Sequence, residues 1–147
     1  SKEIVDKDGK SNTDNLRDTI VKALNNEKVT VKVQSISSKD APPAMILLPE
    51  QMRRINDMGA YMEQKMPGLP EYHVLLINKE HPLIVGLNKI TGNKIIIDKK
   101  VPIENQLASK IANHVYEMAK LSVGGLDQEQ IINLQNNNAE LISELLK

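Results

Sequence analysis

The residue types that could do chemistry in this sequence are three histidines, His73, His81 and His114, together with scattered carboxylates. A zinc site needs histidine or carboxylate ligands at short spacings, such as H-E-x-x-H on one helix. These histidines fall instead on a predicted strand, in the first turn of a predicted helix and beside an apolar helical stripe. We therefore expect them to serve the core or the surface, and we predict no metal site.

Signatures of the other common catalytic sites do not occur in the sequence. The seven glycines form neither a G-x-x-x-x-G-K nor a G-x-G-x-x-G loop, whose backbone amides would hold phosphate. No serine lies in a G-x-S-x-G turn, and the chain has no cysteine, so no activated nucleophile is evident. Asp127 and Glu129 lie in the first turn of a predicted helix, where carboxylates favour the positive end of the dipole. We predict no catalytic residue and no cofactor.

The composition argues against several kinds of partner. Lysine plus arginine and aspartate plus glutamate both number 19, which gives a formal net charge of zero and no basic field for nucleic acid or an anionic membrane surface. No apolar run approaches the roughly 20 residues of a transmembrane helix, and no signal peptide opens the chain. The 147 residues, 40% of them hydrophobic, are typical of one soluble domain. Because cysteine is missing, we expect a cytoplasmic protein.

Hydrophobic periodicity predicts short strands and helices in alternation. Val29 and Val33 belong to an alternating run that is typical of a half-buried strand. The predicted strands are Val29–Val33, Ala44–Leu48 and Tyr72–Ile77. The predicted helices are Thr13–Asn26, Pro49–Lys65, Asn78–Ile90, a long helix through Leu107 and Met118, and a last helix from Asp127 to the end of the chain. Residues 91–103, with their run of isoleucines, fit a strand or a loop equally well.

The short helix that ends near Ile90 has a candidate N-cap in Asn78. Pro82 fits near its start, where a missing N–H costs little. The residues that we expect to face inward from this helix are Leu83, Leu87 and Ile90.

The last two helices form a predicted hairpin, because Gly124-Gly125 is typical of a left-handed C-cap and Asp127 with Gln130 of a capping box. Their apolar faces are broader than two helices can bury against each other, and the second spans roughly half of the circumference. Two such hairpins related by a twofold axis would form a four-helix bundle. We therefore expect a homodimer, and the residues expected at its interface are Leu107, Ile111, Val115, Met118, Ile131, Leu134, Asn138, Leu141, Ile142 and Leu145.

Two points about this hairpin stay open from the pattern alone. Its helices could pack on the sheet of their own protomer instead of on a second hairpin. The small residues Ala108, Ala112 and Ala119 would permit close approach of the sheet or of the second hairpin. Asn138, near the centre of the second stripe, could be buried, where a polar residue fixes register. It could equally be solvated at the edge of the bundle.

Four of the six methionines gather on one predicted helix. At 3.6 residues per turn, the side chains that share a sector roughly 120° wide are Met52, Ile55, Met58, Met62 and Met66. Methionine is flexible and polarizable, so such a stripe adapts to many apolar partners. The same stripe could instead fill an irregular core.

Several segments, taken in order, resemble the C-terminal domain of the heat-shock protein 90 chaperones of the bacterial HtpG branch. The resemblance covers nearly the whole chain and includes residues 14–24 and 41–48, the methionine helix and the Pro70-Glu71-Tyr72 segment. Its most specific part is the Asn-x-x-His-Pro-Leu segment at residues 78–83, which follows a predicted strand.

This resemblance implies an α+β fold, in which a small three-stranded mixed sheet is flanked by helices and a C-terminal helix pair forms an intermolecular four-helix bundle. Residues 1–12 would be the linker from a preceding middle domain. Residues 13–147 would be the C-terminal dimerisation domain, with an α/β subdomain at 13–100 and dimerisation helices at 101–147. The resemblance also implies client contact by Met52, Ile55, Met58, Tyr61, Met62 and Met66.

The implied function is homodimerisation and contact with unfolded or partly folded client proteins, within an ATP-dependent molecular chaperone. ATP and Mg²⁺ would bind in the N-terminal domain of the parent, so this fragment is not expected to be an enzyme. The sequence ends in Leu145-Leu146-Lys147 instead of the Met-Glu-Glu-Val-Asp tail of cytosolic eukaryotic members, so tetratricopeptide co-chaperones are not expected partners. The alternative, from another class, is a small ligand-binding or enzymatic α/β domain with a pocket beside the sheet.

Overall fold

The computed structural model describes residues 12–48, 69–91 and 103–147, which form an α+β fold. The predicted helix from Pro49 to Lys65 lies outside the described residues. The isoleucine run at 95–97 and nearly all of the expected N-terminal linker lie outside them as well. The helices, strands and contacts named for this protein belong to the three described segments.

The sheet has three strands, β1 (Val29–Gln34), β2 (Ala44–Leu47) and β3 (His73–Asn78), in the order β1-β3-β2. β1 runs parallel to β3, and β2 runs antiparallel to it. Every residue of the central strand β3 is buried, whereas β1 alternates between buried valines and exposed polar residues over its first four positions. The predicted strands and the mixed three-stranded sheet are thus confirmed, with bounds that shift by one residue.

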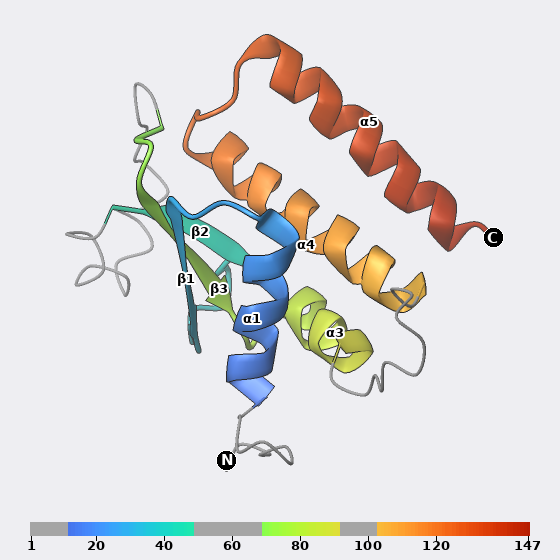
Figure 1. Ribbon diagram of the computed structural model, residues 1–147, viewed down its shortest axis with the longest axis horizontal. Coiled ribbons are helices and arrows are strands. Elements are labelled where there is room, and N and C mark those ends of the chain that lie inside the picture. Colours follow the sequence, from blue (N-terminus) through green and yellow to red (C-terminus); the bar gives the residue numbers. More distant parts are fainter. Residues whose placement is uncertain (1–11, 49–68, 92–102) are drawn as a thin grey trace.

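Four helices are described, α1 (Asn12–Leu24), α3 (Pro82–Thr91), α4 (Ile103–Ser122) and α5 (Gln128–Leu145). α1 packs on β1, and α4 packs on β2, α1 and α3. Figure 1 shows α5 outermost, on the far side of α4 from the sheet. α4 therefore separates the sheet from α5.

The core is mainly aliphatic, and Tyr116 is its aromatic member among the described residues. Its fully buried members include Leu16 and Ile20 of α1, Leu75 of β3 and Ile84 of α3. The inward face of α4 adds Ala108, Ala112, Val115, Tyr116 and Ala119, and Val123 follows directly after the helix. α4 is therefore part of the same core as the sheet.

The start of α3 differs from the sequence prediction. Asn78 does not cap this helix, because its side-chain oxygen accepts from the backbone N–H groups of Ile36 (3.2 Å) and Glu80 (3.1 Å). The cap is His81: its Nδ1 accepts from the N–H of Leu83 at 3.1 Å, and its carbonyl accepts the first helical bond. Pro82 then takes the first helical position, where its fixed φ suits the helix.

The side of α3 that faces the core also differs in part from the prediction. Leu83, predicted to point inward, is 43% exposed, whereas Ile84 is completely buried. Leu87 is buried and Ile90 packs against the core, as predicted. Ile84 and Leu87 lie three positions apart, which is the spacing of a helical face.

Helix ends elsewhere follow local backbone rules. α1 stops at Leu24, two residues before its predicted end, because Asn25 adopts a positive φ of 46° that no helix continues through. Gly124, with φ 75°, ends the helical region of α4, and the N–H of Gly125 donates to the carbonyl of Lys120 at 2.8 Å. This is the left-handed C-cap that the glycine pair predicted. The capping box of Asp127 and Gln130 at the start of α5 is confirmed as well.

Two glycine-to-alanine substitutions should change stability in opposite directions. Gly124→Ala places a side chain on a residue with φ 75° and should lower the free energy of unfolding by about 1–2 kcal/mol. Gly86→Ala adds a methyl group in the interior of α3, where nothing lies within 4 Å, and should raise it by roughly 0.5–1 kcal/mol. Urea unfolding measures both, and changes of the same sign would contradict the described turn.

Candidate functional site

The candidate site is the hairpin of α4 and α5, in which α5 is attached to the rest of the molecule by very little buried surface. Leu134 is the one buried residue of this 18-residue helix. It does not belong to the main cluster of buried side chains that joins the sheet, α1, α3 and α4. α5 is therefore held as an appendage of α4 rather than as part of the core.

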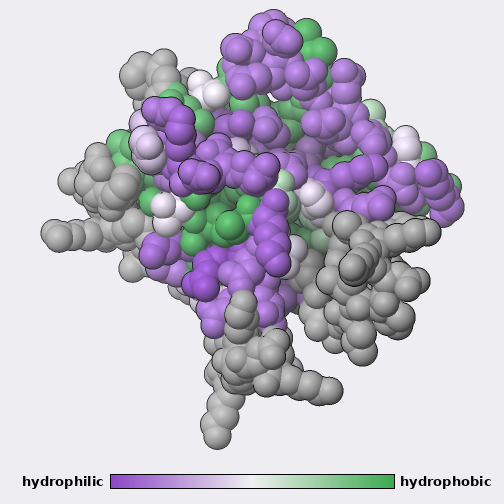
Figure 2. Space-filling model, in the orientation of Figure 1, coloured by the Kyte–Doolittle hydropathy of each residue, from purple (hydrophilic) through white to green (hydrophobic). Residues whose placement is uncertain are grey.

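Large apolar side chains of the hairpin are exposed. On α5 and just beyond it, Leu145 is 83% exposed and Leu146 81%. Partly exposed apolar residues on the two helices are Met118, Leu121, Ile132 and Ile142. On the face shown in Figure 2, hydrophilic residues predominate along the hairpin and hydrophobic ones emerge at its margins. A helix with this much uncovered apolar surface is typical of an interface.

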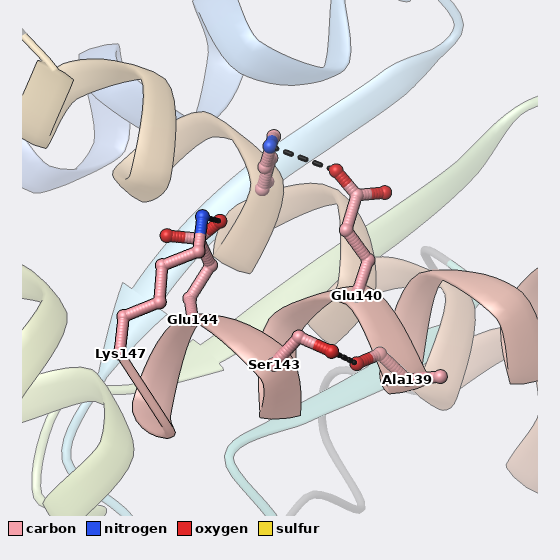
Figure 3. Close-up of polar contacts among 6 residues, drawn as sticks. Ala139, Glu140, Ser143, Glu144 and Lys147 are labelled. Atoms are coloured by element: carbon pink, nitrogen blue, oxygen red, sulfur yellow. Dashed lines mark hydrogen bonds and ion pairs between the residues drawn. The ribbon is translucent and has the colours of Figure 1, made fainter.

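One flank of the hairpin is polar. The Lys110 ammonium of α4 donates to the Glu140 carboxylate of α5 at 2.9 Å, and Figure 3 shows this contact beside the Glu144–Lys147 ion pair. The hydrogen bond to Glu140, and then its charge, raises the pKa of Lys110, and the same contact lowers the pKa of Glu140. Both side chains are about half exposed, so the pair orients α5 more than it stabilises it.

A cavity of about 170 Å³ lies on this polar flank, between the two helices. Its lining includes Asn113 and His114 of α4 and Asn137 of α5. The Nδ1 atom of His114 is buried there, and it has no hydrogen-bond partner among the described residues. The two helices of one protomer therefore do not pack completely against each other on this side.

Leu141 lines the cavity on this polar flank, but the exposed apolar residues of α5 turn away from it. At about 100° per residue, Ile142 and Leu145 lie roughly 160° and 140° around the helix from Glu140. Leu134 lies between the polar sector that contains Glu140 and the apolar sector that contains Ile142 and Leu145. α4 therefore covers only one border of the apolar stripe. The wider part of the stripe faces away from its own protomer.

The residues predicted for a dimer interface fall into three groups. Buried within the protomer are Val115, which belongs to its core, and Leu134, which packs at the hairpin. Half-buried are Leu107, Ile111, Ile131 and Leu141. Exposed are Met118, Asn138, Ile142 and Leu145. Asn138 is thus solvated in the single protomer.

Sequence reasoning missed one exposed apolar residue of α4, Leu121, which is 39% exposed. It lies three residues after Met118, at the spacing of a helical face, and this was the signal that could have found it. The residues predicted for client contact lie outside the described part of the chain, and these are Met52, Ile55, Met58, Tyr61, Met62 and Met66.

The described histidines do not converge on a common site. His73 bonds to Pro70 and Tyr116, His81 caps α3, and His114 lines the hairpin cavity. An open hollow of about 470 Å³ beside the sheet includes His81 and Glu80, but Glu80 already accepts from the Ser35 hydroxyl at 2.9 Å. Within residues 12–48, 69–91 and 103–147, no cluster of three or more histidine and carboxylate side chains could hold a metal ion.

Comparison with models of known protein families and with curated protein sequences returns no match to this chain. None of the helices in the described residues combines the length and apolar character needed to span a membrane. Function is therefore inferred from the hairpin and from the sequence resemblance.

Tyr116 gives a pH test of the packing beneath the hairpin. Burial, followed by the charge of Glu117, raises the pKa of the Tyr116 phenol from 10.0 to about 12. Between these pH values the unfolded chain loses this proton before the folded chain does, so stability should fall by up to roughly 2–3 kcal/mol as the pH rises. Below pH 10 this effect vanishes.

The measurement is urea unfolding from pH 9 to pH 12 with the wild type and Tyr116→Phe. The phenylalanine variant should lack this part of the alkaline decline, although its stability at neutral pH should be lower because His73 loses its partner. Equal alkaline slopes for the two proteins would show that the phenol is accessible to solvent.

Proposed function

We propose that this chain is the C-terminal dimerisation and client-contact module of an ATP-dependent molecular chaperone that resembles HtpG. The observation that carries the proposal is the apolar stripe of α5, of which a single residue is buried within the protomer. In this proposal the module works in the cytoplasm and binds no cofactor. The parent chaperone binds ATP and Mg²⁺ in its N-terminal domain and hydrolyses the nucleotide.

The energetics of α5 favour a second copy as the occupant of this surface. Fully burying one leucine or isoleucine side chain stabilises a complex by roughly 1.5–3 kcal/mol. Each protomer offers Ile142, Leu145 and Leu146 in exposed positions, and a symmetric contact uses each of them twice. Two hairpins packed as a four-helix bundle would bury about 1,200 Å² or more, which is the size of a stable interface.

Charge provides no competing explanation for the exposed face. α5 carries three glutamates and no lysine or arginine, so this surface lacks the basic field that binding to nucleic acid or to an anionic membrane requires. The resemblance to HtpG adds the symmetric dimer and the client-contact helix at residues 50–65. Dimerisation would place two such helices in one chaperone, where they act on the same client.

Ile142→Asp should convert the dimer to monomers at micromolar concentration, because it places a charge in the apolar face that two copies would bury. The matched control is Asn133→Asp, which adds the same charge at an exposed position roughly 180° around α5. Sedimentation velocity should give a dimer for the wild type and the control and a monomer for Ile142→Asp.

Circular dichroism should show the same helix content for all three proteins, because Ile142 is 48% exposed in the protomer. An Ile142→Asp protein that keeps the dimer mass would remove this face of α5 from the interface. Leu134 is unsuitable for this test, since it is buried against its own protomer and its replacement would disturb the hairpin itself.

The client-contact part of the proposal has its own test. In the full-length parent, Met58→Glu combined with Met62→Glu should weaken the suppression of client aggregation and leave the dimer mass unchanged. The added charges would disrupt an apolar contact surface, and the sequence of α5 would stay unchanged. A marked loss of thermal stability in this variant would instead show that the methionines belong to the core.

A further inference from the structure

The inner face of α4 combines three alanines with two larger buried side chains, Val115 and Tyr116. Ala108, Ala112 and Ala119 face the core and are at most 3% exposed. Alanine stripes allow close approach, but they present shallow ridges, so at these three positions interlocking of side chains contributes little to the rotation and axial position of the helix. Directional polar contacts can therefore help to fix the rotation and axial position of α4.

Two polar contacts hold α4 at neighbouring positions on its inner side. The Asn113 side-chain amide donates to the Ala23 carbonyl near the end of α1 at 3.0 Å. Three residues later, the Tyr116 hydroxyl lies 2.8 Å from Nε2 of His73 on the central strand β3. One contact joins α4 to a helix and the other joins it to the sheet.

The His73–Tyr116 contact is buried and its proton arrangement is determined by its surroundings. The Pro70 carbonyl can only accept, so Nδ1 of His73 carries a proton and donates to it at 2.8 Å. For a neutral ring this leaves Nε2 to accept from the Tyr116 hydroxyl. The exposed fractions are 4% for His73 and 7% for Tyr116, so water cannot readily replace either partner.

The face of the Tyr116 ring is also covered. The Lys120 ammonium lies 4.4 Å from the ring centroid and forms an ion pair with Glu117 at 3.0 Å. Lys120 is also the residue whose carbonyl accepts from Gly125 at the turn into α5. The His73–Tyr116 hydrogen bond is thus linked through Lys120 to the end of α4, where the chain turns into α5.

We propose that His73 and Tyr116 are positioning residues for dimerisation: their bond sets the rotation of α4 and so aims α5 at a second copy. The inference rests on the dimer proposed above. Met118 lies two residues beyond Tyr116 and is 47% exposed, so a small rotation of α4 would move it together with α5. In a symmetric dimer α4 would be rotated in both copies, so the loss of dimer affinity would be larger than for a change in one copy.

Two amide substitutions of His73 separate this role from general packing. In His73→Gln the terminal amide can reach the position of Nε2 and keep the bond to Tyr116. In His73→Asn the shorter amide can reach the position of Nδ1 and keep the bond to Pro70. We expect the dimer dissociation constant to rise about tenfold or more for His73→Asn and for Tyr116→Phe, and to stay within about threefold of the wild type for His73→Gln.

Sedimentation equilibrium over a concentration series measures these constants, at a temperature where unfolding curves show each protein to be folded. Ile20→Val is the stability control, because it removes one methylene group from the core on α1, where Ile20 is 1% exposed. Its dimer should keep the wild-type affinity although its stability falls.

The outcomes keep the two proposals apart. A wild-type protein that stays monomeric would remove the proposed dimer itself. A wild-type dimer whose affinity is unchanged in His73→Asn and Tyr116→Phe would overturn the positioning role. The same holds if His73→Gln loses as much affinity as His73→Asn, or if affinity simply follows stability across all variants, including Ile20→Val.

Discussion

The constraint on which this structure depends is how little of the apolar surface of α5 its own protomer covers. Its apolar residues extend over about half of the helix, whereas α4 covers one border of that stripe and buries Leu134 alone. An 18-residue helix gains most of its stability from packing, since isolated helices of this length are marginal in water. The exposed isoleucine and leucine side chains are thus the part of the molecule that a partner would stabilise most.

The remainder of the fold supports that hairpin. A central strand that is buried along its whole length, β3, is flanked by one parallel and one antiparallel neighbour. α4 lies over this sheet through alanines, and this close packing leaves its outer side free to carry α5. Polar contacts at Asn113 and Tyr116 join α4 to the end of α1 and to β3.

The sequence predicted those elements whose signals are local. The alternating valines of β1, the glycine pair after α4 and the Asp127 capping box each depend on neighbouring residues, and each was confirmed. The start of α3 was wrong because the Asn78 side chain accepts a tertiary hydrogen bond from the backbone of Ile36, 42 residues away, and local rules do not contain that bond. The His73–Tyr116 contact joins residues 43 positions apart, and a scan of histidine spacing cannot detect it. Nor could periodicity show which border of the α5 stripe α4 would cover.

The most direct test of the account is the mobility of spin labels on two sides of α5. The chain has no cysteine, so Leu145→Cys and Asn133→Cys each provide one labelling site, and both positions are exposed in the protomer. Electron paramagnetic resonance should show a label at position 145 that is immobilised at high concentration and freed by dilution, and a label at position 133 that is mobile throughout. Equal mobility of the two labels at every concentration would contradict a dimer formed through the apolar face of α5.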